Sequence, residues 1–179
     1  MPRRKRIKYI DGYAVFRPID EDIELAHKRS CKLGTIPHPY MKSMGRMTGF
    51  LGEIAVQKFL GYRSRYVGDK EITHDIVYKR HRIEVKSKAC RGRPDSNYIA
   101  FVNGKRDMVP NNDIYFFTRV RGDFRKVYIV GWLPTSTFFD EAQYYDVGEY
   151  DEFGYHFLLA GFTIPIAELH EPKEFKAYL

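Results

Sequence analysis

The segment 83–86 offers a pair of ionisable side chains whose spacing could serve catalysis. It reads Ile-Glu-Val-Lys, and successive side chains of a β-strand point to opposite faces. The two aliphatic residues would therefore point into a core, while Glu84 and Lys86 lie side by side on the other face. Taken alone, such a pair is typical of a solvent-exposed strand. Whether it is part of a catalytic site depends on the neighbouring residues.

A second carboxylate, Asp75, precedes this segment. The stretches 72–78 and 82–89 are rich in β-branched residues and are separated by a polar turn, which predicts an antiparallel hairpin. Opposed residues of such a pair share a face, so we expect Asp75 opposite Glu84 or Lys86. A register shifted by one residue would separate these side chains.

Two carboxylates on one patch are suited to a divalent metal. Mg²⁺ is a hard ion that takes oxygen ligands and keeps much of its water shell. Asp75 and Glu84 would supply carboxylate oxygens, and the backbone carbonyl of Val85 is placed as a further ligand. A bound metal polarises a phosphoryl oxygen and lowers the pKa of a coordinated water. The residues therefore predict a Mg²⁺ site, in which Mn²⁺ could substitute, for cutting phosphodiester bonds.

Lys86 has two conceivable roles in this chemistry. It could orient or deprotonate the attacking water, or it could neutralise charge on the phosphoryl group. A role as base requires a pKa well below the ordinary lysine value of about 10.4. Two nearby carboxylates act in the opposite direction, so we favour the electrostatic role.

Two helices are predicted before the hairpin. Asp20 is a good N-cap for a helix over residues 21–33. The stretch 35–47 contains two prolines and is typical of a loop. Thr48 then caps a helix over residues 49–60, which has a broad apolar face.

The rest of the chain is mostly strand. The predicted elements are a strand at 98–102, a hairpin of strands 114–120 and 126–133, a helix at 135–143, an acidic loop at 140–152, and a closing strand with a last turn within 156–169. This order predicts a mixed α/β or α+β domain with one central mixed β-sheet flanked by helices. We assign residues 20–179 to that single domain and residues 1–19 to a basic N-terminal arm and lead-in.

Asp75 followed by the segment 83–86 resembles the motif of the PD-(D/E)XK nuclease superfamily, which has the restriction-endonuclease-like fold. The helix over 49–60 adds to the resemblance, because many members carry an acidic residue on their first core helix, aimed at the metal site. That residue would be Glu53. The resemblance covers residues 48–90, and it departs from the family at His74, where many members have proline.

The resemblance implies a Mg²⁺-dependent deoxyribonuclease, and an endonuclease in particular. Asp75 and Glu84 would hold the metal, and Glu53 would assist directly or through a water. Glu53 could instead be a solvent-facing residue at the edge of the apolar stripe. His74 could touch the metal or its water shell, or it could make an ordinary structural hydrogen bond. An exonuclease, a junction resolvase, an RNA-directed enzyme and a non-catalytic nucleic-acid-binding protein stay open. Members often dimerise, so a homodimer is compatible.

The charge of the chain favours a nucleic-acid partner, most simply DNA. The formal net charge is +7 and the isoelectric point is about 9.3. The cations predicted to contact phosphate are Lys79, Arg80, Arg82, Lys88, Arg91 and Arg93. Lys42 and Arg46 precede the Glu53 helix, and the basic arm at 2–8 could lie along phosphates or be solvated. Alternatively, the charges keep the hairpin soluble.

Compartment and membrane association are predicted from the remaining composition. Cys31 and Cys90 lack metal-ligand spacing and are far apart, which favours reduced thiols in a cytoplasm. The basic N-terminus is followed by no apolar run, so residues 1–20 do not resemble a signal peptide. No stretch approaches the roughly 20 apolar residues that span a bilayer, so we expect no membrane partner.

Overall fold

The chain forms a central seven-stranded mixed sheet. The computed structural model describes residues 6–32, 43–61, 64–68 and 74–179. The strands, in spatial order, are β1 (Ile7–Ile10), β2 (Tyr13–Phe16), β8 (Val127–Pro134), β7 (Ile114–Arg121), β5 (His81–Cys90), β4 (Ile76–Tyr78) and β3 (Ser64–Tyr66). Only β5 and β7 run parallel, and the other neighbours are antiparallel. The predicted mixed central sheet is therefore confirmed.

A second sheet of three strands lies beside it. Its order is β6 (Ile99–Asn103), β10 (Gly161–Pro165) and β9 (Gln143–Tyr145). This second sheet was not predicted beside the central one. Strands β7 and β8 are buried along almost their whole length on both faces. Such strands need a layer on each side. The second sheet supplies one of these layers, and β9 lies where the sequence predicted an acidic loop.

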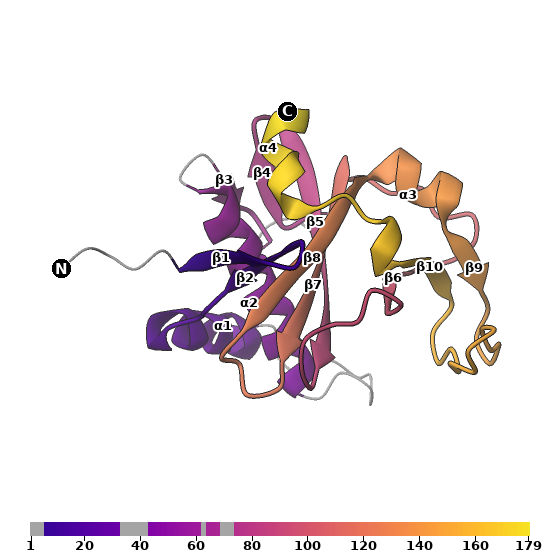
Figure 1. Ribbon diagram of the computed structural model, residues 1–179, viewed down its shortest axis with the longest axis horizontal. Coiled ribbons are helices and arrows are strands. Elements are labelled where there is room, and N and C mark those ends of the chain that lie inside the picture. Colours follow the sequence, from indigo (N-terminus) through magenta and orange to yellow (C-terminus); the bar gives the residue numbers. More distant parts are fainter. Residues whose placement is uncertain (1–5, 33–42, 62–63, 69–73) are drawn as a thin grey trace.

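Helices flank the central sheet as predicted. Helices α1 (Asp20–Lys32) and α2 (Ser43–Leu60) cover one face, and α3 (Thr135–Glu141) lies with the second sheet on the other (Figure 1). The chain ends with η1 (Ile166–Glu168), η2 (Pro172–Glu174) and α4 (Phe175–Tyr178). Two apolar clusters result, one on each face of β7 and β8. Within the described residues, no helix has both the length and the apolar character that crossing a bilayer requires.

Helix α2 starts six residues earlier than predicted. It begins at Ser43, and Thr48 is a buried residue inside it rather than its cap. The predicted loop extended to residue 47 because of the prolines upstream. No proline falls within 43–47, where it would interrupt a helix. Met47 is buried in the core, so packing stabilises the added turn. The remainder of the predicted loop, residues 35–42, lies outside the described residues.

Residues 7–16, which we assigned to the lead-in, form a hairpin of the central sheet. Strand β1 pairs with β2, and β2 pairs with β8. The turn is Asp11-Gly12, and both residues have positive φ, at 49° and 83°. Asp-Gly between apolar stretches is a strong hairpin signal, because both central residues of a type I′ turn need positive φ. Most of the predicted basic arm, residues 2–5, lies outside the described residues.

Candidate functional site

The β4–β5 hairpin places Asp75 beside Glu84. Ile76 pairs with Ile83 in the antiparallel ladder, so the next positions in register are Asp75 and Glu84. Asp75 lies immediately before β4, and its N–H donates to the Ile83 carbonyl at 2.9 Å. Its Oδ2 accepts the N–H of Val85 at 2.8 Å. Asp75 thus bonds to the residues on both sides of Glu84, as the predicted hairpin requires.

Glu84 and Lys86 form an ion pair on β5. Lys86 Nζ lies 2.7 Å from Glu84 Oε1, and the side chains are 28% and 18% exposed. Ile83 and Val85 alternate with them and are buried in the core. The alternation expected from the sequence is therefore present. The pair is half-buried rather than fully solvated, which distinguishes it from an ordinary surface contact.

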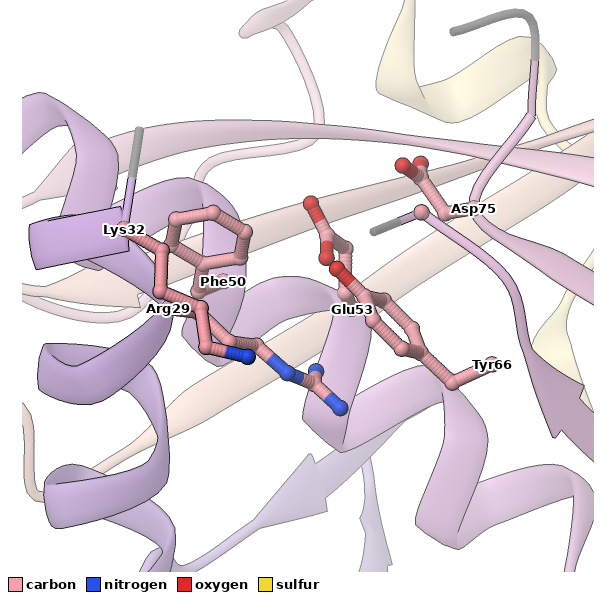
Figure 2. Close-up of a pocket in the computed structure, with 7 residues that line it drawn as sticks. Arg29, Lys32, Phe50, Glu53, Tyr66 and Asp75 are labelled. Carbon is pink, nitrogen blue, oxygen red and sulfur yellow. The ribbon is translucent and has the colours of Figure 1, made fainter. Parts of the chain in front are cut away.

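Glu53 approaches the same region from helix α2. Glu53 and Asp75 line one pocket of about 370 Å³, together with Arg29 and Tyr66 (Figure 2). A Cβ at the neighbouring residue, Gly52, would overlap the Ser87 hydroxyl on β5. The absence of a side chain at this position lets α2 lie against β5, and this close approach carries Glu53 towards Asp75.

The carboxyl group of Glu53 is held in an unfavourable setting for charge. Burial and the neighbouring Asp75 raise the pKa of Glu53 well above its ordinary value, and Glu84 adds to the rise. A hydrogen bond from Tyr66 and the charge of Arg29 act in the opposite direction. Its Oε2 is buried and has no hydrogen-bond partner among the described residues. Glu53 is therefore not the solvent-facing residue at the stripe's edge.

The carboxyl group of Asp75 is also poorly stabilised in its charged form. Burial, followed by the charge of Glu84, raises the pKa of Asp75 to about 7. The Val85 N–H and the charges of Lys86 and Arg29 lower it, but they do not compensate. Three carboxylates thus interact within one region with too little positive charge to stabilise all of them in ionised form.

The carboxylate oxygens of this region fit a divalent cation. Mg²⁺ binds hard oxygen ligands, and its charge would compensate the negative charge of the carboxylates. Glu53 Oε2 is an unused acceptor, and Asp75 and Glu84 could add further oxygens. Within the described part of the chain, no three His, Cys, Asp or Glu side chains are already assembled as a metal cluster. Glu84 Oε1 is bonded to Lys86 instead. The Val85 carbonyl stays a predicted ligand.

The predicted phosphate-binding cations do not form one ring around the site. Lys79 and Arg80 lie at the exposed turn of the β4–β5 hairpin, and Arg91 is exposed beyond the other end of β5. Arg93 pairs with Asp11 at 2.6 Å. Lys88 continues the face that carries Glu84 and Lys86. Their contacts with nucleic acid stay predictions.

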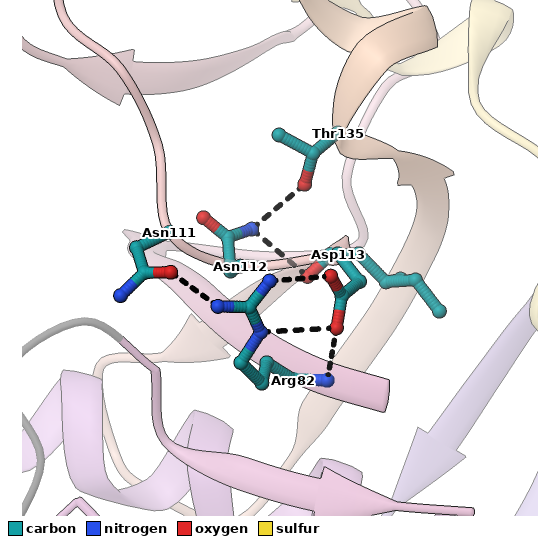
Figure 3. Close-up of polar contacts among 6 residues, drawn as sticks. Arg82, Asn111, Asn112, Asp113 and Thr135 are labelled. Atoms are coloured by element: carbon teal, nitrogen blue, oxygen red, sulfur yellow. Dashed lines mark hydrogen bonds and ion pairs between the residues drawn. The ribbon is translucent and has the colours of Figure 1, made fainter. Parts of the chain in front are cut away.

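Arg82 has a structural partner. Its guanidinium makes two hydrogen bonds to Asp113, at 2.8 and 3.2 Å, and it also bonds to Asn111 (Figure 3). The Arg82 N–H donates to Asp113 as well, at 2.7 Å. Asn112 bonds to Thr135 in the same network. These bonds tie the start of β5 to the start of β7, so Arg82 positions the strand that carries the candidate site.

Arg29 and Tyr66 line the pocket and were not singled out in the sequence. Arg29 is 8% exposed, and its guanidinium lies 3.4 Å from the centroid of the Tyr66 ring. Nothing in the residue pattern signals this contact, because Arg29 resembles an ordinary charge on an amphipathic helix. His74 is buried and has interactions of its own, and its role near the metal stays a prediction. Lys42 lies outside the described residues, and Arg46 bonds to the Ser30 carbonyl at 3.5 Å.

Comparison with known proteins adds no relative. No known family model and no curated protein matches this chain. The PD-(D/E)XK resemblance therefore rests on the residues themselves.

Proposed function

We propose that this protein is a Mg²⁺-dependent nuclease of the PD-(D/E)XK superfamily that hydrolyses DNA phosphodiester bonds. The observation that carries the proposal is that Glu53 and Asp75 line one pocket, while the Glu84–Lys86 ion pair lies close enough to Asp75 to affect its pKa. Partly buried carboxyl groups with strongly shifted pKa values are frequent at functional sites.

In the proposed site Asp75, Glu84 and Glu53 hold the metal. When bound, Mg²⁺ would polarise the phosphoryl group and lower the pKa of a water. The raised pKa values of Glu53 and Asp75 mean that the protein releases protons as these oxygens become ligands. The Val85 N–H fixes one oxygen of Asp75, which leaves the other free to bind.

Lys86 stabilises negative charge on the phosphoryl group. Its ammonium group forms an ion pair with Glu84 at 2.7 Å, and this contact is consistent with the electrostatic role. The side chain is partly exposed and can exchange Glu84 for a phosphate oxygen. Such a group stabilises the charge that develops on the phosphoryl oxygens during hydrolysis.

Other parts of the proposal follow from sequence and charge. DNA as the substrate, endonucleolytic cleavage and a homodimeric state are consistent with the net charge of +7 and with the resemblance. A cytoplasmic location is consistent with the free thiols of Cys31 and Cys90. The Glu84–Lys86 ion pair also supports a second candidate, a nucleic-acid-binding protein that does not cleave.

Cleavage assays decide between these functions. Purified protein is incubated with plasmid, linear and branched DNA, and with RNA, in Mg²⁺, Mn²⁺ or EDTA. We expect Mg²⁺-dependent cleavage of DNA that is lost in Lys86→Ala, Asp75→Asn and Glu84→Gln. Lys58→Ala and Glu24→Gln, at exposed positions of α2 and α1, are matched controls that should remain active. Cleavage that persists in EDTA or in all three site variants would contradict the proposal, and binding without cleavage would favour the second candidate.

A further inference from the structure

A second pocket adjoins the candidate site on the other side of β5. Its volume is about 440 Å³, and it lies between β5 and β7 of the central sheet and β6 of the second sheet. Figure 1 shows these sheets side by side. Phe101, Tyr155 and Leu159 form its apolar walls, and Lys86 lines it as well. Because Lys86 also forms the ion pair with Glu84, a ligand in this pocket would lie beside the proposed cleavage site.

The polar side of this pocket is cationic. Lys86 and Lys88 lie on the same face of β5, and Arg119 is the cross-strand partner of Lys88 on the parallel strand β7. Lys88 Nζ is 3.1 Å from the Tyr155 hydroxyl and 4.5 Å from the centroid of its ring. Two residues of strand advance about 6.6 Å, so the cations form a row that leads away from Glu84.

Arg119 is a buried cation without a carboxylate partner among the described residues. It is only 5% exposed, and it donates to the Ile99 carbonyl and lies 5.7 Å from the Tyr98 ring. Burial lowers the pKa of Arg119, and the groups that oppose this are the thiol of Cys90 and three tyrosines rather than an acid. A buried cation in this setting would be stabilised by an anionic group of a bound ligand.

The loop 146–160, which joins β9 to β10, lies next to the pocket, and among the described residues no ion pair joins its carboxylates to Lys86, Lys88 or Arg119. Asp151 accepts the N–H groups of Phe153 and Tyr155, at 3.0 and 2.7 Å. Glu149 accepts the N–H of Asp146 at 2.7 Å. These carboxylates stabilise the turns of their own loop, and the residues of this loop that line the pocket are Tyr155 and Leu159.

We infer that this pocket binds an unpaired nucleotide of the substrate strand, next to the bond that is cut. The inference rests on the proposed function and names its substrate class as nucleic acid with a single-stranded or displaced nucleotide at the cleavage site. The base stacks on Tyr155 and Phe101, and its phosphate contacts Lys88. Lys86 connects the pocket to the carboxylates.

An unpaired nucleotide fits these features better than intact duplex does. A pocket of a few hundred cubic ångströms is the size that encloses a small molecule. A paired base cannot enter it without leaving the helical stack. Aromatic rings with adjacent cations are the usual platform for unpaired bases, because every base has a face that can stack. The cations contact phosphate without reading sequence, so we expect little base preference.

Fluorescent oligonucleotides test the inference in EDTA, where cleavage is absent. The probes carry 2-aminopurine either in a single strand or in a blunt duplex of the same sequence. We expect quenching and tight binding of the single strand. Tyr155→Ala should weaken that binding about 5- to 150-fold, the range for loss of one stacked base, with no comparable effect on duplex. Lys88→Ala should reduce the salt dependence by about 0.7 in the log–log slope.

Tyr150→Ala is the matched control, because Tyr150 is an exposed tyrosine of the same loop that stacks on His156 and does not line the pocket. It should bind like wild type, and the melting temperatures of both tyrosine variants show whether the loop is intact. Equal affinity for single strand and duplex, or an equal effect of the two variants, would overturn the inference. Quenching that depends on Tyr155 in a protein that cleaves nothing would support this subsite while refuting the nuclease. Cleavage of DNA by a protein whose binding of the single strand is unchanged in Tyr155→Ala would support the nuclease and refute this subsite.

Discussion

At the scale of single residues, the site is defined by the surroundings of its carboxyl groups. Glu53 and Asp75 both have raised pKa values, and burial is the largest cause for each. Lys86 and Arg29 offset only part of the effect on Asp75. The metal-free protein therefore keeps protons at this site near neutral pH, and a divalent cation would compete with those protons.

The first prediction concerns the pH dependence of stability without metal. Asp75 has a folded-state pKa of about 7 against an ordinary value of 3.8, so the folded state keeps a proton that the unfolded chain releases between these values. The free energy of unfolding should therefore fall as pH rises from about 4 to about 7. Glu53 acts in the same direction. Asp75→Asn, which can still accept the Val85 N–H, should flatten this dependence.

Urea titrations in EDTA at about pH 5 and about pH 7.5 measure this dependence. Asp107→Asn, in an exposed loop, is the control and should keep the wild-type dependence. A dependence that is unchanged in Asp75→Asn would show that Asp75 is not protonated near neutral pH.

The second prediction is that Mg²⁺ stabilises the folded protein. A cation held by Asp75, Glu84 and Glu53 binds the folded state only, and adds about 2.7 kcal/mol at a hundredfold excess over its Kd. Melting curves near pH 7.5 should shift upwards with Mg²⁺ or Mn²⁺ and return with EDTA. Glu53→Gln should shift less than wild type, whereas Glu24→Gln should shift equally. Identical melting temperatures in Mg²⁺ and EDTA would argue against a metal at these residues.

At the scale of elements, the packing of α2 on β5 sets the position of Glu53. Gly52 faces the hydroxyls of Ser87 and Thr118, which bond to each other at 2.8 Å. The β4–β5 hairpin was predicted correctly because its alternation and turn are local features of the sequence. The start of α2 was not, because burial of Met47 depends on distant residues. The β1–β2 hairpin was missed although its Asp11-Gly12 turn is a local signal, and only its pairing with β8 depends on distant residues.

The third prediction compares two glycines of α2. Gly52→Ala should destabilise the protein by about 1–3 kcal/mol, because the added methyl group overpacks the contact with β5. Gly49→Ala meets no atom within 4 Å, so it should stabilise the helix by up to about 1 kcal/mol. Urea denaturation measures both. If Gly52→Ala is as stable as Gly49→Ala, the close approach of α2 and β5 is not present in solution.

At the scale of the whole molecule, β7 and β8 join two apolar clusters into one unit. Trp132 lies in the cluster under α2, and Phe138 lies in the cluster under the second sheet. The two pockets open on different sides of this shared sheet, and Lys86 on β5 links the second pocket to the candidate site. The sheets should therefore unfold together rather than as separate parts.

The fourth prediction tests this coupling with Trp132, the single tryptophan. Phe138→Ala removes a fully buried ring from the other cluster and should cost about 3–5 kcal/mol. Trp132 fluorescence and far-ultraviolet circular dichroism should then report one common transition at lower denaturant. Ala substitution at Phe153, which is highly exposed, should leave both curves unchanged. A fluorescence transition that stays at the wild-type midpoint would mean that the clusters unfold independently.

The sequence by itself determined the β4–β5 hairpin, the pairing of Glu84 with Lys86 on one strand face and the mixed character of the sheet. These follow from side-chain alternation and turn composition, which are properties of neighbouring residues. The tertiary structure alone decided that Glu53 interacts with Asp75, that Arg119 is a buried cation, and that a second sheet forms a pocket beside Lys86. Each depends on packing between elements far apart in the chain, where burial determines whether a charge is stabilised by water or needs a partner.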